Sequence, residues 1–291
     1  MTSAFFPLAL PLLVVLGQQP ATNQTAASPT AASPTPSAQL PEQPATISDN
    51  SFLIEEAYNQ ERGVVQHINL FTRGWTEKAW LYGFTQEWPI NAAPRNQISY
   101  SIGALSGSPG QGDGVGDVWV NYRYQVVSRD RVAVAPRASV IFPTGNAQEG
   151  RGNGGAGVEF ALPVSVTPSK SWALHSNAGT TIVDNGENEA GEHATTLGAW
   201  VGQSVVWMAK PRVNLLVEAI YRRQQDVAGA GQTTWETDFV LSPGIRWAYN
   251  FKNGLQIVPG VAVPINFHKN AENDWTILGY LSFEHPFGHR K

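Results

Sequence analysis

The stretch from Gly114 to Gly145 constrains the fold more than any other part of the chain. In its first half apolar residues stand at every second position, and polar or charged residues fill the positions between them, as in Asp117-Val118-Trp119-Val120-Asn121-Tyr122-Arg123. The second half, Val132 to Phe142, alternates in the same way after a turn at Ser128-Arg129-Asp130-Arg131. Because side chains alternate along a strand, the pattern predicts two long antiparallel strands, each with one apolar and one polar face.

The same alternation continues to Phe287, and tight turns alternate with longer loops. We expect tight turns near Gly74, Ser128, Pro168, Met208 and Asn250. We expect longer loops near Asn91, Gly145, Asp184, Asp226 and His268. This arrangement predicts about twelve strands, an even number, as bacterial outer-membrane barrels have.

The pattern is less regular before Ala79. There we expect the first two strands at Phe52–Tyr58 and Val64–Thr72. We interpret Pro89–Gly114 as a long loop, in which Gln97–Ala104 forms a short hairpin or an extra pair of strands.

The two ends of the chain differ in composition from the strand-rich part. Residues 1–17 are a hydrophobic leader without Lys or Arg, too short for a membrane-spanning helix of about 20 residues, and we predict a secretory signal peptide. Residues 18–50 are rich in Ala, Pro, Ser and Thr and contain no aromatic residue, which predicts a disordered linker. The predicted barrel then covers residues 51–287, and a polar tail follows at 288–291.

Composition favours a transmembrane barrel over a soluble β-sandwich or closed soluble barrel, whose half-buried strands would alternate too. Charged residues make up 14% of the chain, against about 25% in typical soluble domains. The expected strands exceed the usual five or six residues of soluble proteins, carry charges at mid-strand, and often end on aromatic residues such as Trp88 and Trp235. We therefore predict an all-β, antiparallel, up-and-down transmembrane barrel.

Two further features exclude function classes. The net charge of −4 gives no basic surface for nucleic acid. The absence of cysteine excludes disulfides, thiolate metal sites and cysteine nucleophiles.

If the apolar faces meet lipid, the charged mid-strand residues face the lumen, where charges set permeability and selectivity. The candidate lumen residues are Glu87, Asp117, Arg123, Arg137, Glu159, His175, Glu218, Arg222, Glu236, Asp238 and Arg246. Two interpretations stay open. In the first, acidic and basic side chains pair and close a narrow lumen. In the second, they line a selective channel. Both are open because the lumen of a barrel of about twelve strands is wider than that of filled eight-stranded barrels and narrower than that of open porins.

Signals for catalysis are weak. His175 could face the lumen beside Ser139 or Ser165, but the catalytic Ser–His pairs of outer-membrane hydrolases usually face lipid. The close pair His285 and His289 lies at the tail, where a solvated terminus is the simpler interpretation. We therefore predict no enzyme, no cofactor and no metal site.

Three blocks of sequence resemble a known family: GDGVGDVWVNYRYQ, VAPRASVIFPTGN and LSPGIRWAYNFKNGLQIVPGVAVPI. They are similar to the outer-membrane proteins of the meta-pathway phenol-degradation family, which are often described as transporters. The resemblance runs from about Glu55 to Phe287, and its strongest pieces are Gly116-Asp117, Pro143-Thr144-Gly145, Pro243-Gly244 and Pro259-Gly260. It implies a barrel and the uptake of small aromatic or hydrophobic molecules, and it carries no catalytic residues.

The sequence thus predicts a channel or transporter in the bacterial outer membrane for small, hydrophobic or aromatic molecules. The expected partners are outer-membrane lipid, a small-molecule solute and the barrel assembly machinery, without nucleic acid, and the oligomeric state stays open. A structural or surface barrel with a closed lumen is the first alternative. A secreted soluble β-barrel or β-sandwich that binds a ligand is the second.

Overall fold

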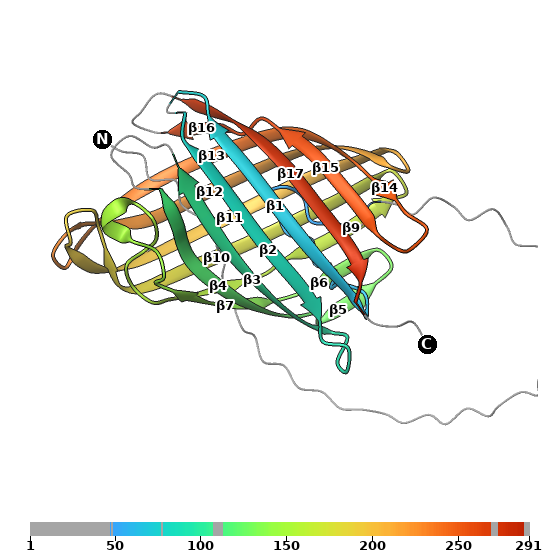
Figure 1. Cartoon of the computed structure of the whole chain (residues 1–291), viewed down its shortest axis with the longest axis horizontal. Coiled ribbons are helices and arrows are strands. Elements are labelled where there is room, and N and C mark those ends of the chain that lie inside the picture. Colours follow the sequence, from blue (N-terminus) through green and yellow to red (C-terminus); the bar gives the residue numbers. More distant parts are fainter. Residues whose placement is uncertain (1–46, 48, 77, 107–112, 269–272, 288–291) are drawn as a thin grey trace, which may run out of the picture.

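The computed structural model describes residues 47, 49–76, 78–106, 113–268 and 273–287, which form one closed antiparallel barrel with strongly tilted strands (Figure 1). Seven wall strands are continuous: β1 (Val64–Gly74), β2 (Trp80–Pro89), β3 (Asn96–Ser106), β10 (Trp172–Glu187), β11 (His193–Lys210), β12 (Val213–Gly229) and β17 (Asp274–Pro286). Five consist of two segments each: β4 (Gly114–Tyr124) with β5 (Val127–Arg129), β6 (Val132–Val134) with β7 (Arg137–Phe142), β8 (Gly157–Ala161) with β9 (Val164–Ser169), β13 (Gln232–Trp247) with β14 (Tyr249–Asn250), and β15 (Gln256–Ala262) with β16 (Ile265–His268). Seventeen segments therefore make twelve wall strands, and pairing of β1 with β17 closes the barrel.

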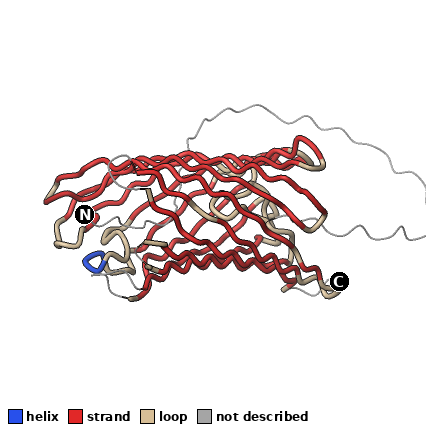
Figure 2. Tube along the Cα trace, turned by 90° about the horizontal axis from the view of Figure 1, so that it is seen from above, coloured by secondary structure: helices blue, strands red, loops and turns tan. Residues whose placement is uncertain are grey.

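Helical structure in the described residues is limited to one 3₁₀ turn, η1 (Ala147–Glu149), at the end of the barrel opposite the end of β17 (Figure 2). No helix among these residues has the length and hydropathy needed to cross a membrane. The predicted signal peptide, most of the predicted linker and the polar tail lie outside the described residues, and they stay predictions.

Proline explains most of the interruptions in the wall strands, because it has no N–H to donate to a neighbouring strand. Pro136 separates β6 from β7, Pro163 separates β8 from β9, and Pro264 separates β15 from β16. The first two breaks are neighbours, since the Ala135 N–H donates to the Pro163 carbonyl at 3.0 Å. The ladder continues on both sides of each break, so the barrel stays closed.

The two faces of the wall follow the alternation read from the sequence. Val120 and Val140 face each other across β4 and β7 and are 41% and 47% exposed on the outside, whereas the intervening Asn121 and Ser139 are buried inside. An outward face this apolar is unsuited to water and suited to lipid. The predicted fold class is confirmed.

The connections divide the barrel into two ends. The turn end carries the short connections after β2, β5, β9, β11 and β14. The start of β1 and the end of β17 also lie there, since the Phe287 N–H donates to the Gly63 carbonyl at 2.8 Å. The loop end carries the 143–156 connection with η1. The connection after Gly74 lies at the loop end and the one at Asn91 at the turn end, so their predicted sides were wrong.

One predicted strand and one predicted loop near the N-terminus were also wrong. Phe52–Tyr58 forms no strand, and its place in the barrel count is taken by β3, which the sequence analysis interpreted as part of a loop. The two errors cancel, which is why the predicted strand number still agrees with the structure.

Candidate functional site

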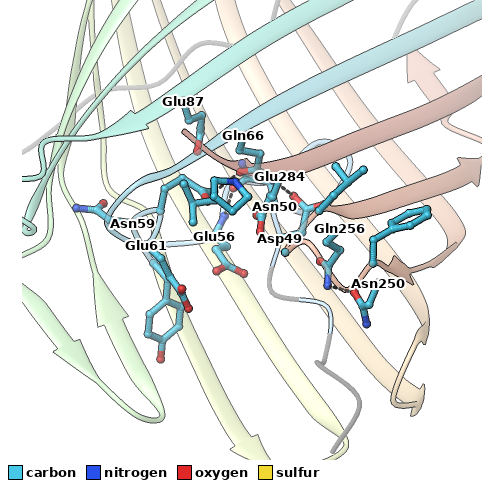
Figure 3. A pocket seen from close by; sticks show the side chains of 17 residues that line it. Asp49, Asn50, Glu56, Asn59, Glu61, Gln66, Glu87, Asn250, Gln256 and Glu284 are labelled. Atoms are coloured by element: carbon cyan, nitrogen blue, oxygen red, sulfur yellow. Dashed lines mark hydrogen bonds between the residues drawn. The ribbon is translucent and has the colours of Figure 1, made fainter. Parts of the chain in front are cut away.

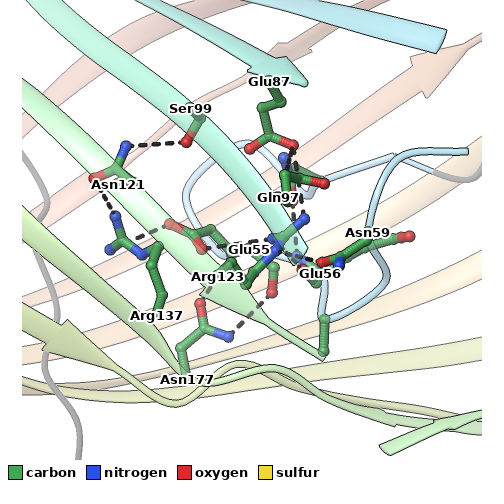
Figure 4. Close-up of polar contacts among 12 residues, drawn as sticks. Glu55, Glu56, Asn59, Glu87, Gln97, Ser99, Asn121, Arg123, Arg137 and Asn177 are labelled. Carbon is green, nitrogen blue, oxygen red and sulfur yellow. Dashed lines mark hydrogen bonds and ion pairs between the residues drawn. The ribbon is translucent and has the colours of Figure 1, made fainter. Parts of the chain in front are cut away.

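Asp49–Gln60, here called the luminal segment, lies inside the barrel and contacts the inner wall near the turn end (Figures 3 and 4). The wall uses its own backbone groups in the strand ladders, so polar side chains must satisfy the backbone of the luminal segment. Many of the predicted lumen residues do this.

Arg246 and Glu218 hold the first half of the luminal segment. The Arg246 guanidinium donates to the Asp49 carbonyl at 3.1 Å and to the Asn50 carbonyl. Glu218 Oε1 accepts the N–H groups of Leu53 at 2.8 Å and Ile54 at 3.0 Å. Both wall side chains are buried, and charged partners make these hydrogen bonds stronger than neutral ones.

Asn177 on β10 binds the backbone of the luminal segment at Glu55. Its side-chain amide donates to the Glu55 carbonyl at 3.0 Å and accepts the Glu55 N–H at 2.9 Å. A neighbouring strand would offer the same pair of bonds. Asn177 therefore substitutes for a ladder partner, a role that the sequence analysis missed.

Arg123 on β4 holds the second half of the luminal segment (Figure 4). It donates to the carbonyl groups of Glu56 and Tyr58, each at 2.9 Å, and to Asn59 Oδ1 at 3.1 Å. The Glu87 carboxylate lies 3.7 Å from the same guanidinium. These contacts use all three of its nitrogen atoms.

Arg137, Glu159 and Glu55 form a second ionic group beside Arg123 (Figure 4). Arg137 pairs with Glu159 at 2.7 Å and with Glu55 at 3.3 Å, so one cation joins two wall strands to the luminal segment. Glu159 is 0% exposed, and loss of either partner would leave a buried unpaired charge.

Glycines in the wall make room for the apolar side chains of the luminal segment. A Cβ atom on Gly260 would lie 2.5 Å from the Phe52 ring, and one on Gly244 equally close. A Cβ atom on Gly202 would lie 2.3 Å from the Ile54 Cδ1 atom. The Pro243-Gly244 and Pro259-Gly260 pairs, which belong to the family resemblance, thus provide the contact surface for the Phe52 ring, here called the seat of Phe52.

The other predicted lumen residues take different positions. Asp117 accepts the N–H groups of Gly145 at 3.0 Å and Asn153 at 2.7 Å, so it anchors the loop-end connection.

His175 Nδ1 lies 2.8 Å from Ser165 Oγ, which also accepts the Ala57 N–H at 2.8 Å. The remaining three predicted lumen residues, Arg222, Asp238 and Glu236, lie nearer the loop end. Arg222 on β12 stands opposite Asp238 on β13, and Glu236 lies two residues before Asp238 on β13.

An acidic cavity of about 270 Å³ lies beside the luminal segment at the turn end (Figure 3). Its carboxylates are Asp49, Glu56, Glu61, Glu87 and Glu284, and no Lys or Arg of the described residues lines it. In the part of the chain that the structure describes, no group of three or more His, Asp or Glu side chains is placed to hold a metal ion.

Comparison with solved structures supports the fold. The COG4313 outer membrane channel from Pseudomonas putida F1 aligns with 79% of this chain and 97% of its own, at 10% identity and a TM-score of 0.53. The NanC porin aligns with 75% of this chain and 98% of its own, at 9% identity and a TM-score of 0.52. The chain therefore has the fold of these outer-membrane proteins, a closed antiparallel β-barrel.

The family is shown by sequence. The family model described as "Putative MetA-pathway of phenol degradation" matches residues 67–286, and the chain belongs to this family. No curated protein matches the sequence.

Proposed function

We propose that this barrel is an outer-membrane channel for small hydrophobic or aromatic molecules, narrowed near the turn end by the luminal segment. Outer-membrane barrels have short periplasmic turns and longer extracellular loops, so the turn end faces the periplasm. Outer-membrane lipid covers the apolar outer face in this proposal, and the barrel assembly machinery inserts the protein.

The apolar belt of the lumen carries the proposal. Between the luminal segment and the loop end, Trp119, Ile141 and Val183 form one buried cluster on the inward face. Trp200 and Ile220 form another, which packs against Ile54. These clusters line one side of the lumen, where apolar side chains favour hydrophobic solutes, and Arg222 stands opposite Trp200 beside them.

Trp119 adds a polar contact for a solute within this belt. Its buried indole N–H has no hydrogen-bond partner among the described residues. A buried donor gains free energy when a ligand oxygen accepts from it, which favours aromatic molecules with a hydroxyl or carbonyl group.

The contact between Ser165 and His175 supports a solute channel over an enzyme, because the Ser165 hydroxyl already binds the luminal segment.

Solute flux into proteoliposomes tests this function. The protein has no cysteine, and Ser51 Oγ lies 2.7 Å from Ser204 Oγ, so the double variant S51C/S204C can lock the luminal segment to the wall reversibly. Protein-free liposomes give the rate at which benzyl alcohol crosses the bilayer unaided. Above that background, we expect the reduced protein to raise the flux of benzyl alcohol more than that of a sugar of similar size, and oxidation to remove the increase. The Ser51→Cys single variant, treated with the same oxidant, is the control.

The closed barrel is the second candidate, and the luminal segment is the observation in its favour. It would be supported if the reduced, folded double variant raised the flux of neither solute above that of protein-free liposomes. Equal passage of both solutes would show a general pore and contradict the hydrophobic channel.

A further inference from the structure

A cluster of aromatic and basic residues lies at the loop end, on the outward face of β1 and β2. The Arg73 guanidinium lies over the Trp80 ring, 4.8 Å from its centroid. The Lys78 ammonium lies over the Trp75 ring at 4.4 Å. Each cation therefore has a preferred position at the membrane boundary instead of extending freely into water.

The turn that carries these residues is firmly held. Trp75 stacks on Trp275 with ring centroids 4.3 Å apart, and its N–H donates to the Trp275 carbonyl at 3.0 Å. The nearby Asp274 carboxylate accepts from the Thr76 hydroxyl at 3.0 Å, and no carboxylate of the described residues forms an ion pair with Arg73 or Lys78. Lys78 has φ of 60°, a conformation that costs free energy for a residue with a side chain.

An apolar groove of about 150 Å³ is lined by Trp80, the ring that Arg73 covers, while Lys78 lies on the neighbouring turn. Ala104 and Ser106 stand opposite Tyr82 and Trp80 in the β2–β3 register, so small side chains leave a depression beside large rings. Phe71 packs against Tyr82 with centroids 4.8 Å apart and forms another wall. A cavity of this size accepts an apolar group about as large as benzene, or a stretch of acyl chain.

We propose that this surface binds one molecule of the phosphorylated glycolipid of the outer leaflet, the lipid A part of lipopolysaccharide. Arg73 and Lys78 would hold a lipid A phosphate, and the groove over Ala104 would take part of an acyl chain. The loop end faces the outer leaflet, the cations lack an ionic partner among the described residues, and the groove begins at the Trp80 ring under Arg73. The site depends on the barrel being in the outer membrane and not on solute passage.

Binding of lipid A to the purified, folded full-length protein in neutral detergent tests the proposal, with native mass spectrometry as the readout. Each cation near a lipid phosphate contributes roughly fivefold to affinity, so R73Q/K78Q should bind lipid A roughly 25-fold more weakly. The matched control is K210Q/R212Q, which removes two exposed cations at the turn end and should bind like wild type.

The two halves of the site are separated by two further measurements. Enzymatically dephosphorylated lipid A should bind wild type as weakly as lipid A binds R73Q/K78Q. Ala104→Phe should fill the groove and weaken binding of lipid A while heat-modifiable migration shows a folded barrel. Equal binding of lipid A by wild type and R73Q/K78Q, or equal binding of the phosphorylated and dephosphorylated lipids by wild type, would overturn the proposal.

Discussion

Replacement of Gly260 by alanine is a direct way to displace the luminal segment without altering it. The new methyl carbon would lie 2.5 Å from Cε1 and 2.6 Å from Cζ of Phe52, and 3.1 Å from the Arg246 Cβ atom. An aromatic ring cannot flex away as a chain end can. The β15 backbone is paired on both sides, with β13 and β17, so the segment should move in preference to the wall. Overpacking of this kind costs about 1–3 kcal/mol.

This free-energy cost should raise the fraction of molecules in which the luminal segment has left the wall, here called the undocked fraction. At about 1.4 kcal/mol per factor of ten, the undocked fraction should rise about 5- to 150-fold. Ser51 is 2% exposed when docked, so a cysteine placed there reacts with a bilayer-impermeant maleimide mainly after undocking. We expect the labelling rate of the S51C protein to rise by that factor when Gly260→Ala is added.

Two controls make the prediction specific. Gly279 lies on another wall strand, and a Cβ atom there would meet its nearest neighbour at 3.9 Å, so Gly279→Ala should leave labelling unchanged. In a Phe52→Ala background the ring is gone, and Gly260→Ala should add little further labelling. If Gly260→Ala labels no faster than Gly279→Ala in folded barrels, the seat of Phe52 does not hold the luminal segment.

Three other side chains give separable effects. Arg123→Gln removes charged donors to the luminal segment and should raise single-channel conductance in planar bilayers, whereas unchanged conductance would show that these bonds do not restrict the lumen. Glu159→Gln leaves Arg137 with Glu55 as its carboxylate partner and should destabilise the barrel by about 1–3 kcal/mol, measured as a lower urea midpoint for loss of the folded band. Asp117→Asn weakens the acceptor that holds the 143–156 connection, so added protease should cleave there faster, and an unchanged cleavage rate would contradict the anchoring role.

The wall could be predicted from sequence because its signal is local. Every second residue of a strand meets the same environment, so Val118, Val120 and Tyr122 indicate lipid without knowledge of any partner strand. The same rule explains why most of the predicted lumen residues do face inward.

The luminal segment could not be predicted in this way. Its Phe52 and Ile54 stand two positions apart, as on one face of a strand, but they fit against glycines far away in the chain. Its backbone binds Glu218 and Asn177 side chains instead of a neighbouring strand, and no periodicity records such bonds. The pairing of Arg137 with both Glu159 and Glu55 is equally non-local.

The positions of the charged residues along the barrel axis bear on selectivity. Arg123, Arg137 and Arg246 already bind the luminal segment or its carboxylates, so they are not free cations that would attract an anionic solute. At the turn end the cavity beside the luminal segment is lined by carboxylates such as Glu61 and Glu284. The lumen is therefore acidic at the turn end, whereas above the luminal segment apolar side chains share the inward face with Arg222 and Asp238. In the proposed channel an anion would meet repulsion from the carboxylates at the turn end, whereas a neutral aromatic molecule would not. The proposed channel should therefore pass neutral aromatic molecules faster than their anionic analogues.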